Sequence, residues 1–314
     1  MDWILTVIGL GLLLLAGDAL VRGAVNLALR VGIPALIVSL TIVAFGTSAP
    51  ELLISVQAIL DGVPSIAVGN VVGSNTANIL LVLGIPALLA VMHTSEHDTR
   101  SNYVQMLAAS VLFIGLCLFG TLNWISGLIL LAGLAAMLLH AMKAIHSHRN
   151  SDEGEDTEVV EGADPNMSWI KIAFFLVVGL VGLPIGANLL IDGATSIARS
   201  FQISEAVIGL TLVAVGTSLP ELATTVMAAL RRQSDVALGN VIGSNLFNLL
   251  GIMGVASLIG DIPIDPEFLR FDLWVMLGTS LLLVPFVFFK KDIGRKTGIG
   301  LSFIYAVYVV MLLN

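Results

Sequence analysis

Two stretches of closely similar sequence decide the fold of this chain, TIVAFGTSAPEL at residues 41–52 and TLVAVGTSLPEL at residues 211–222. A second pair follows at the same spacing, with GNVVGSNTAN at 69–78 and GNVIGSNLFN at 239–248. Aligned without gaps at an offset of 170, the 45-residue segments that begin at residues 40 and 210 are identical at 23 positions. This internal similarity indicates a duplicated sequence, so we expect two structurally related halves.

The composition excludes a soluble globular protein. Of 314 residues, 57% are hydrophobic and 11% are charged, and the mean hydropathy is +1.00. In a soluble domain about 25% of the residues are charged, because the fold needs a water-exposed shell. The single cysteine, Cys117, excludes an intrachain disulfide. We therefore expect helices that cross a lipid bilayer.

Ten apolar segments are long enough to cross the hydrocarbon core, which takes about 20 helical residues. They lie at 3–28, 34–60, 65–91, 104–120, 123–145, 168–198, 204–230, 236–260, 271–289 and 297–313. The first is too long for a signal peptide and has no basic region before it, so we expect it to be retained. The sequence therefore predicts an all-α polytopic membrane protein with ten transmembrane helices.

The predicted helices form two repeats of five, residues 1–145 and 168–314, joined by a linker at 146–167. Because five is an odd number, the second repeat enters the membrane in the opposite sense. Inverted repeats are typical of secondary transporters, with the substrate site near the bilayer midplane. The linker contains seven of the 22 acidic residues, as expected of a solvated, disordered segment. It lacks the ordered ligand spacing of a helix-loop-helix calcium site, which disfavours calcium regulation there.

Basic residues predict the orientation, because cytoplasmic loops of membrane proteins carry an excess of Lys and Arg. The loops and helix ends on one side hold only Arg199 and Arg270. Those on the other side hold Arg22, Arg30, Arg100, Lys143, Arg149, Lys171, Arg231, Arg232, Lys290, Lys291, Arg295 and Lys296. We therefore expect both termini outside and a cytoplasmic linker. The lack of a mitochondrial presequence and the short linker predict location in the plasma membrane of a prokaryote.

The duplicated motif contains one acidic residue in each repeat, Glu51 and Glu221, near the middle of a predicted span. Ionisable residues are costly in a membrane and usually mark a functional site. Small oxygen-bearing side chains surround them: Thr47, Ser48, Ser74 and Asn78 in the first repeat, and Thr217, Ser218, Ser244 and Asn248 in the second. Residues four apart share a helix face, so each threonine should lie beside its glutamate.

Two prolines, Pro50 and Pro220, should break the helices at this motif. Proline lacks an N–H and clashes with the carbonyl group four residues earlier, at Gly46 and Gly216. Unwound backbone offers free carbonyl oxygens, and it is tolerated at membrane depth where it lines a cavity. Carboxylate, hydroxyl, amide and carbonyl oxygens together favour a hard cation such as Ca²⁺ or Na⁺ over Zn²⁺ or Cu⁺.

Structural explanations remain for part of this pattern. Single Ser, Thr or Gly residues in membrane helices usually serve helix packing, and we assign the glycines of GNVVG and GNVIG to that role. Asp18 and Arg22 are four residues apart and should form an ion pair within one helix. A passive channel is disfavoured by the inverted repeat. An intramembrane hydrolase is disfavoured because no Ser/His/Asp set or HExxH motif occurs.

The motifs GTSAPE with GSNTAN, and GTSLPE with GSNLFN, resemble those of the calcium/cation antiporter superfamily, most closely its prokaryotic sodium/calcium exchanger branch. The resemblance covers nearly the whole chain and implies Na⁺/Ca²⁺ antiport by alternating access, with spans one and six as gating helices. It implies no cofactor, nucleic acid or protein partner, only Ca²⁺, Na⁺ and membrane lipid.

The resemblance also implies a ligand set. Ca²⁺ would bind the carboxylates of Glu51 and Glu221 and the backbone carbonyl groups of Thr47 and Thr217. Flanking Na⁺ sites would use Ala44, Ser48 and Ser74 on one side and Ala214, Ser218 and Ser244 on the other, with Asn78 and Asn248 at the remaining midplane position. Because the best-known members have Asp where this chain has Asn248, a proton- or potassium-coupled exchanger remains an alternative.

Overall fold

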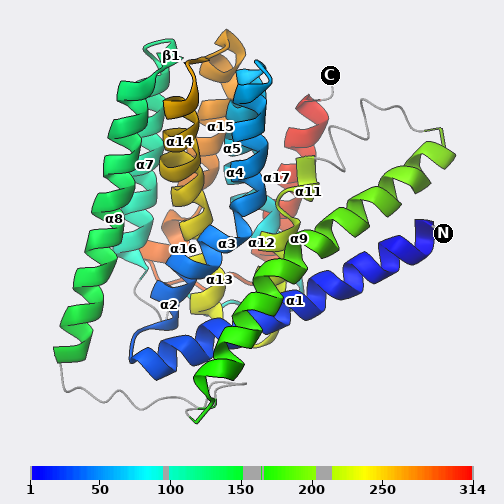
Figure 1. The fold of residues 1–314 in the computed structure, drawn as a ribbon, viewed down its shortest axis with the longest axis vertical. Helices are drawn as coiled ribbons and strands as arrows, with labels where there is room; N and C mark the ends of the chain where they lie inside the picture. The colour runs from blue at the N-terminus through cyan, green and yellow to red at the C-terminus, as the bar shows by residue number, and fades with distance from the viewer. Residues whose placement is uncertain (1, 95–98, 151–163, 165, 203–213, 313–314) are drawn as a thin grey trace.

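The computed structural model describes residues 2–94, 99–150, 164, 166–202 and 214–312, and these are mostly helical (Figure 1). The first half contains α1 (Asp2–Val31), α2 (Ala35–Val38), η1 (Ser39–Val43), α3 (Ala44–Thr47), α4 (Ala49–Leu60), α5 (Pro64–Ala77), η2 (Asn78–Val82), α6 (Gly84–Leu89), α7 (Arg100–Cys117), β1 (Thr121–Leu122) and α8 (Trp124–Asn150). The second contains α9 (Trp169–Ser200), α11 (Ala214–Gly216), α12 (Leu219–Leu230), α13 (Ser234–Leu246), η4 (Phe247–Ile252), α14 (Met253–Ile259), β2 (Ile262–Pro263), η5 (Phe268–Asp272), α15 (Leu273–Leu281), α16 (Val284–Phe288) and α17 (Arg295–Leu312).

The prediction of an all-α membrane protein with several spans is supported by the helices. Within the described residues, seven helical runs are long and apolar enough to cross a membrane, and the bent run from α2 to α4 makes an eighth if it counts as one span. The other two expected spans, 104–120 and 204–230, are not among these runs. Helix α7 has 18 residues and α12 has 12, and residues 203–213 lie outside the described part of the chain. Helix α8 continues to Asn150, and linker residues 151–163 and 165 lie outside the described part of the chain.

Two long helices, α1 and α9, lie side by side across one end of the molecule (Figure 1). Glycines allow their backbones to approach closely. A Cβ atom added to Gly9 would lie 2.9 Å from the Gly186 carbonyl oxygen, and one added to Gly186 would lie 3.1 Å from the Gly9 oxygen. Small residues drive such packing in lipid, where apolar side chains gain little from contacting each other.

The helical runs α5–α6 and α13–α14 are the most buried of the membrane-spanning candidates. In their apolar 18-residue windows, 78% and 83% of the residues are buried. The first helix of each run contains one copy of the GNV(V/I)G motif, and each run contains a π-helical segment, η2 or η4. The packing role assigned to the glycines is confirmed for the second copy, since a Cβ atom at Gly239 would lie 2.8 Å from the Leu36 carbonyl oxygen. It is wrong for Gly73 of the first copy, where the described residues leave nothing within 4 Å of an added Cβ atom. These two runs therefore form the centre of the molecule.

The duplicated helices are interrupted at equivalent residues, Ser48 and Ser218. Helix α3 ends before Ser48, and the axis bends by 44° between the runs that end at Thr47 and begin at Ala49. Ser48 has φ −86° and ψ 7°, and Ser218 has φ −86° and ψ 6°. Pro50 and Pro220 occupy the first turns of α4 and α12, where a missing N–H leaves no helical hydrogen bond unmade.

Two short β pairings connect loops of the two halves. β1 and β2 are antiparallel, with Leu122 opposite Ile262, and Met92 forms an isolated antiparallel bridge with Ile293. Met92 and Ile262 are 170 positions apart, which is the offset of the sequence repeat. The two pairings are therefore equivalent features of the two halves.

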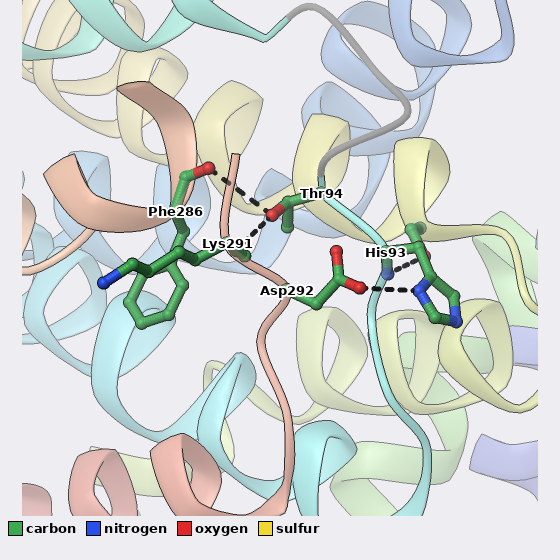
Figure 2. A network of polar contacts seen from close by, with 6 residues as sticks. His93, Thr94, Phe286, Lys291 and Asp292 are labelled. Carbon is green, nitrogen blue, oxygen red and sulfur yellow. Dashed lines mark hydrogen bonds and ion pairs between the residues drawn. The ribbon is translucent and has the colours of Figure 1, made fainter. Parts of the chain in front are cut away.

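Polar contacts reinforce the Met92–Ile293 bridge (Figure 2). His93 Nδ1 lies 2.8 Å from Asp292 Oδ2, and the His93 backbone N–H donates to Ser234 Oγ at 2.9 Å. Thr94 Oγ1 donates to the Lys291 carbonyl oxygen at 2.7 Å. The loop after α6 is thus attached both to the loop before α17 and to the start of α13.

Candidate ion-binding site

The two predicted carboxylates, Glu51 and Glu221, are each 1% exposed and lie in the first turns of α4 and α12. The N-terminus of a helix carries a partial positive charge, which favours a carboxylate there. Glu221 Oε1 accepts a hydrogen bond of 3.1 Å from Ser48 Oγ, so the two halves are in direct contact at the motif. The Oε2 atoms of both glutamates are buried and have no hydrogen-bond partner among the residues that the structure describes.

Ser48 and Ser218 are the N-cap residues of α4 and α12, three positions before the glutamates. The spacing matches a capping box, in which the serine hydroxyl accepts a hydrogen bond from the first turn of its own helix. Neither serine makes that bond. Ser48 donates to Glu221 instead, and Ser218 Oγ is buried without a partner. Both hydroxyl oxygens are therefore left available to other groups in the site.

Thr47, at the end of α3, faces the second half of the chain. Its Oγ1 lies 3.3 Å from two acceptors, the Ala44 carbonyl oxygen in its own helix and Asn240 Oδ1 on α13, which share its one hydrogen. It also lies 3.5 Å from Ser244 Oγ on α13. Among the other predicted residues, Ser74 and Ala44 are also buried. Thr217 lies in the turn between α11 and α12, and Ala214 is the first residue of α11.

Four asparagines link the two halves at the π-helical segments. Asn78 Nδ2 donates to Asn245 Oδ1, and Asn248 Nδ2 donates to Asn75 Oδ1, both at 3.0 Å. Asn75 and Asn245 also donate to each other's backbone carbonyl groups at 3.4 Å. Because these bonds use the amide nitrogens, the Oδ1 atoms of Asn78 and Asn248 remain buried and without a partner.

Sequence reasoning missed Asn75 and Asn245. Both belong to the GSN tripeptide, which is identical in the two copies, so the repeat itself contained the signal. Our prediction considered the serine of GSN and the asparagine that ends each block, and it passed over the residue between. Their side chains orient the carboxamides of Asn78 and Asn248, which were predicted.

Five oxygen atoms of predicted site residues share one property within the described structure: they are buried and lack a hydrogen-bond partner. They are Glu51 Oε2, Glu221 Oε2, Asn78 Oδ1, Asn248 Oδ1 and Ser218 Oγ. Buried polar atoms are normally paired, and an unpaired group in a native structure points to a missing partner such as an ion. Carboxylate and amide oxygens in this number suit a hard cation.

Comparison with known proteins gives a consistent picture. A family model described as sodium/calcium exchanger protein matches residues 1–143 and 171–314. The inner membrane protein YrbG of Escherichia coli is 34% identical over 310 residues, which cover 98% of this chain and 95% of that protein. The sodium/calcium exchanger MaX1 of Methanosarcina acetivorans is 33% identical over 348 aligned residues, covering 99% of this chain and 98% of the relative.

The fold is also similar to solved structures of the sodium-calcium exchanger NCX_Mj. One, soaked with zero Na⁺ and Ca²⁺, has a TM-score of 0.83 and 32% identity over 99% of this chain and 98% of its own. Another, soaked with 2.5 mM Na⁺ and 1 mM Sr²⁺, has a TM-score of 0.81 and 31% identity over 98% and 97% of the two chains. The likeness therefore extends over the whole chain.

Proposed function

Because this chain belongs to the sodium/calcium exchanger family, within the calcium/cation antiporter superfamily, we propose that it exports Ca²⁺ in exchange for Na⁺ that enters down its gradient. The protein is a multi-pass membrane transporter and not an enzyme. The observation that carries the proposal is the five buried oxygen atoms that have no partner among the described residues; three of them belong to side chains that contact the other half, Glu221, Asn78 and Asn248. A cation supplies the partner that these oxygens lack.

The proposed ligand assignment is the one that the resemblance to the antiporter family implies, and the five unpaired atoms belong to residues of that set. Ca²⁺ binds the carboxylates of Glu51 and Glu221 together with the backbone carbonyl groups of Thr47 and Thr217. Na⁺ sites flank it, with Ala44, Ser48 and Ser74 on one side and Ala214, Ser218 and Ser244 on the other, and Asn78 and Asn248 complete the midplane. The bonds from Ser48 to Glu221 and from Thr47 to the Asn240 side chain support this grouping, because they bring both halves to one site.

The architecture of the proposal is ten transmembrane helices in two inverted repeats, residues 1–145 and 168–314, with a cytoplasmic linker at 146–167 and both termini outside. The equivalent helix breaks, the equivalent π-helical segments and the equivalent β pairings support the repeat. Alternating access arises from sliding of α1 and α9 against the remaining helices. Their packing against each other, backbone to backbone, supports movement as one unit.

Sharing of the two glutamates couples the two fluxes. Two carboxylates balance the charge of one Ca²⁺, and Na⁺ needs the same oxygens, so the two ions cannot occupy the site together. Exchange with more than two Na⁺ therefore moves net positive charge inward and is electrogenic. Asn248 adds no charge to this balance.

The test is transport in liposomes. Purified protein in Na⁺-loaded vesicles is diluted into choline buffer, and uptake of radioactive Ca²⁺ is measured, with Glu221→Gln as the inactive variant. Parallel vesicles carry a K⁺ or a proton gradient instead, because Asn248 favours the second candidate, a proton- or potassium-coupled exchanger. Uptake that needs internal Na⁺ supports the proposal. Uptake driven only by H⁺ or K⁺ rejects sodium coupling and supports the second candidate.

A further inference from the structure

The GNV(V/I)G motif contains an asparagine that the ion site does not use, Asn70 in the first copy and Asn240 in the second. Asn240 Nδ2 donates to the Glu221 backbone oxygen at 3.4 Å and to Thr225 Oγ1 at 3.2 Å. The carboxamide thus joins α13 to the first turn of α12, which carries the carboxylate of the site. Both hydrogens of the amide are engaged, so its orientation is fixed.

The same arrangement is present in the first half. Asn70 Nδ2 donates to the Glu51 backbone oxygen at 3.1 Å and to Ser55 Oγ at 3.0 Å. Asn70 and Asn240 are 170 positions apart, as are Ser55 and Thr225. In each half, an asparagine of the next helix binds a hydroxyl four residues after the glutamate. Because the arrangement occurs twice, it is not an accidental contact. Each pair anchors the helix turn from which an ion-site glutamate projects.

The second copy makes one further bond, which crosses between the halves. Asn240 Oδ1 lies 3.3 Å from Thr47 Oγ1 and shares its hydrogen with the Ala44 carbonyl oxygen, which lies at the same distance, while Asn240 Nδ2 binds the Glu221 backbone. One buried side chain therefore holds Thr47 of the first repeat and Glu221 of the second. We propose that Asn240 is a positioning residue that sets the separation of these two Ca²⁺ ligands, an inference that rests on the proposed ligand set.

The physical reason is the narrow range of metal–oxygen distances. Ca²⁺ binds oxygen at about 2.3–2.6 Å, so a shift of a few tenths of an ångström in one ligand weakens binding. Groups that orient metal ligands typically change metal affinity by about 10–100-fold when they are removed. Loss of the Asn240 contacts should therefore raise the Ca²⁺ concentration that half-saturates transport, while the glutamates themselves are retained.

Thr225→Val tests the proposal with little change in shape, and Thr224→Val is its matched control. Both threonines are 0% exposed. The Thr225 hydroxyl accepts from Asn240 on the neighbouring helix, whereas the Thr224 hydroxyl donates to the Pro220 carbonyl oxygen within α12 at 2.8 Å. Both variants lose one buried hydroxyl, but only Thr225→Val loosens the link to Asn240. Thr225→Ser keeps the hydroxyl and should restore normal behaviour.

Two readouts are measured for each variant in full-length protein: the Ca²⁺ dependence of Na⁺-driven uptake, and the Ca²⁺-induced rise in unfolding temperature in detergent. We expect Thr225→Val to raise the half-saturating Ca²⁺ concentration about fivefold or more, because a buried amide hydrogen loses its partner. Thr224→Val and Thr225→Ser should stay close to wild type. Asn240→Ala should raise the half-saturating Ca²⁺ concentration more than Thr225→Val does. In both variants the maximal rate of uptake should change less than the half-saturating concentration.

Equal half-saturation in Thr225→Val, Thr224→Val and wild type would overturn the positioning role. Failure of the proposed function is a different result, in which wild-type vesicles show no Na⁺-driven uptake. The unfolding measurement then decides alone. If Ca²⁺ stabilises wild type and Thr225→Val needs more Ca²⁺ for the same effect, Asn240 positions a Ca²⁺ site in a protein with another transport mode. If Ca²⁺ stabilises neither, both proposals are rejected.

Discussion

An ion pair between α1 and α12 should control how easily α1 moves. Asp18 of α1 pairs with Arg231, the residue after α12, and also with Arg22 one turn along its own helix at 2.9 Å. The expected Asp18–Arg22 pair is confirmed, but Arg231 was not foreseen. If α1 slides against the other helices during transport, the Asp18–Arg231 pair must break, whereas the Asp18–Arg22 pair can travel with the helix. Asp18→Asn therefore favours conformations in which α1 has moved.

The size of the effect follows from burial. The side chains of Asp18 and Arg231 are 18% and 15% exposed, so the pair is neither fully solvated nor fully buried. A hydrogen bond to a charged group contributes about 1.5–3 kcal/mol, and partial exposure favours the lower figure. A change of about 1.4 kcal/mol alters an equilibrium constant tenfold. We therefore expect Asp18→Asn to shift the conformational equilibrium of α1 by roughly tenfold.

Pulsed electron spin resonance can measure this shift. Spin labels replace Leu15 on α1 and Leu230 at the end of α12, both exposed, in a Cys117→Ala background that removes the single native cysteine. The control is Arg22→Gln, which removes a pair within one helix, worth about 0.3–0.5 kcal/mol. Asp18→Asn should populate a second label distance that Arg22→Gln does not. Identical distance distributions in both variants and the parent, with unchanged transport, would refute the reasoning.

Three other outcomes are expected. Glu51→Gln should reduce Na⁺-driven Ca²⁺ uptake at least about 100-fold, because removing one charged partner from a buried site costs about 3–5 kcal/mol; near-normal uptake would contradict the shared-carboxylate mechanism. Gly186→Ala should lower the free energy of unfolding by about 1–3 kcal/mol through overpacking against α1. Gly11→Ala, with no atom within 4 Å of its new Cβ, is the control in thermal unfolding, and equal effects would exclude close α1–α9 packing. His93→Ala should lower the free energy of unfolding by at most about 1 kcal/mol, because the paired side chains of His93 and Asp292 are 47% and 35% exposed. A larger loss of stability would show that the loop contact stabilises the whole fold.

The repeat made much of the site predictable from sequence. Comparing the two copies identified Glu51 and Glu221 as an equivalent pair, and the proline directly before each glutamate indicated the helix break that the structure has at Ser48 and Ser218. The duplication identifies candidate site residues because a polar residue that is present in both copies is unusual among apolar helices. Asn70 and Asn240 are also identical in the two copies. We passed over them because we assigned the surrounding glycines to helix packing.

Features outside the repeat were not predictable in this way. Arg231 lies 213 positions after Asp18, and the equivalent positions in the other half, Asp61 and Asn188, cannot form the same ion pair. Helix periodicity links residues three or four apart, so it identified Arg22 as a partner for Asp18 and could not identify Arg231. Long-range pairs without a repeated copy require the tertiary structure.

The two N-cap serines indicate which requirement shaped the motif. A serine that caps a helix contributes about 1 kcal/mol to stability, and Ser48 and Ser218 have the position for it but do not make the bond. The chain forgoes that stabilisation twice, at equivalent sites, and leaves a buried hydroxyl oxygen without a partner at Ser218. A motif selected only for helix breaking would retain the caps, because proline alone supplies the break. The missing caps are explained if the serine hydroxyl oxygens bind a cation beside the two glutamates. The loss of helix-cap stability is therefore an argument for the ion site.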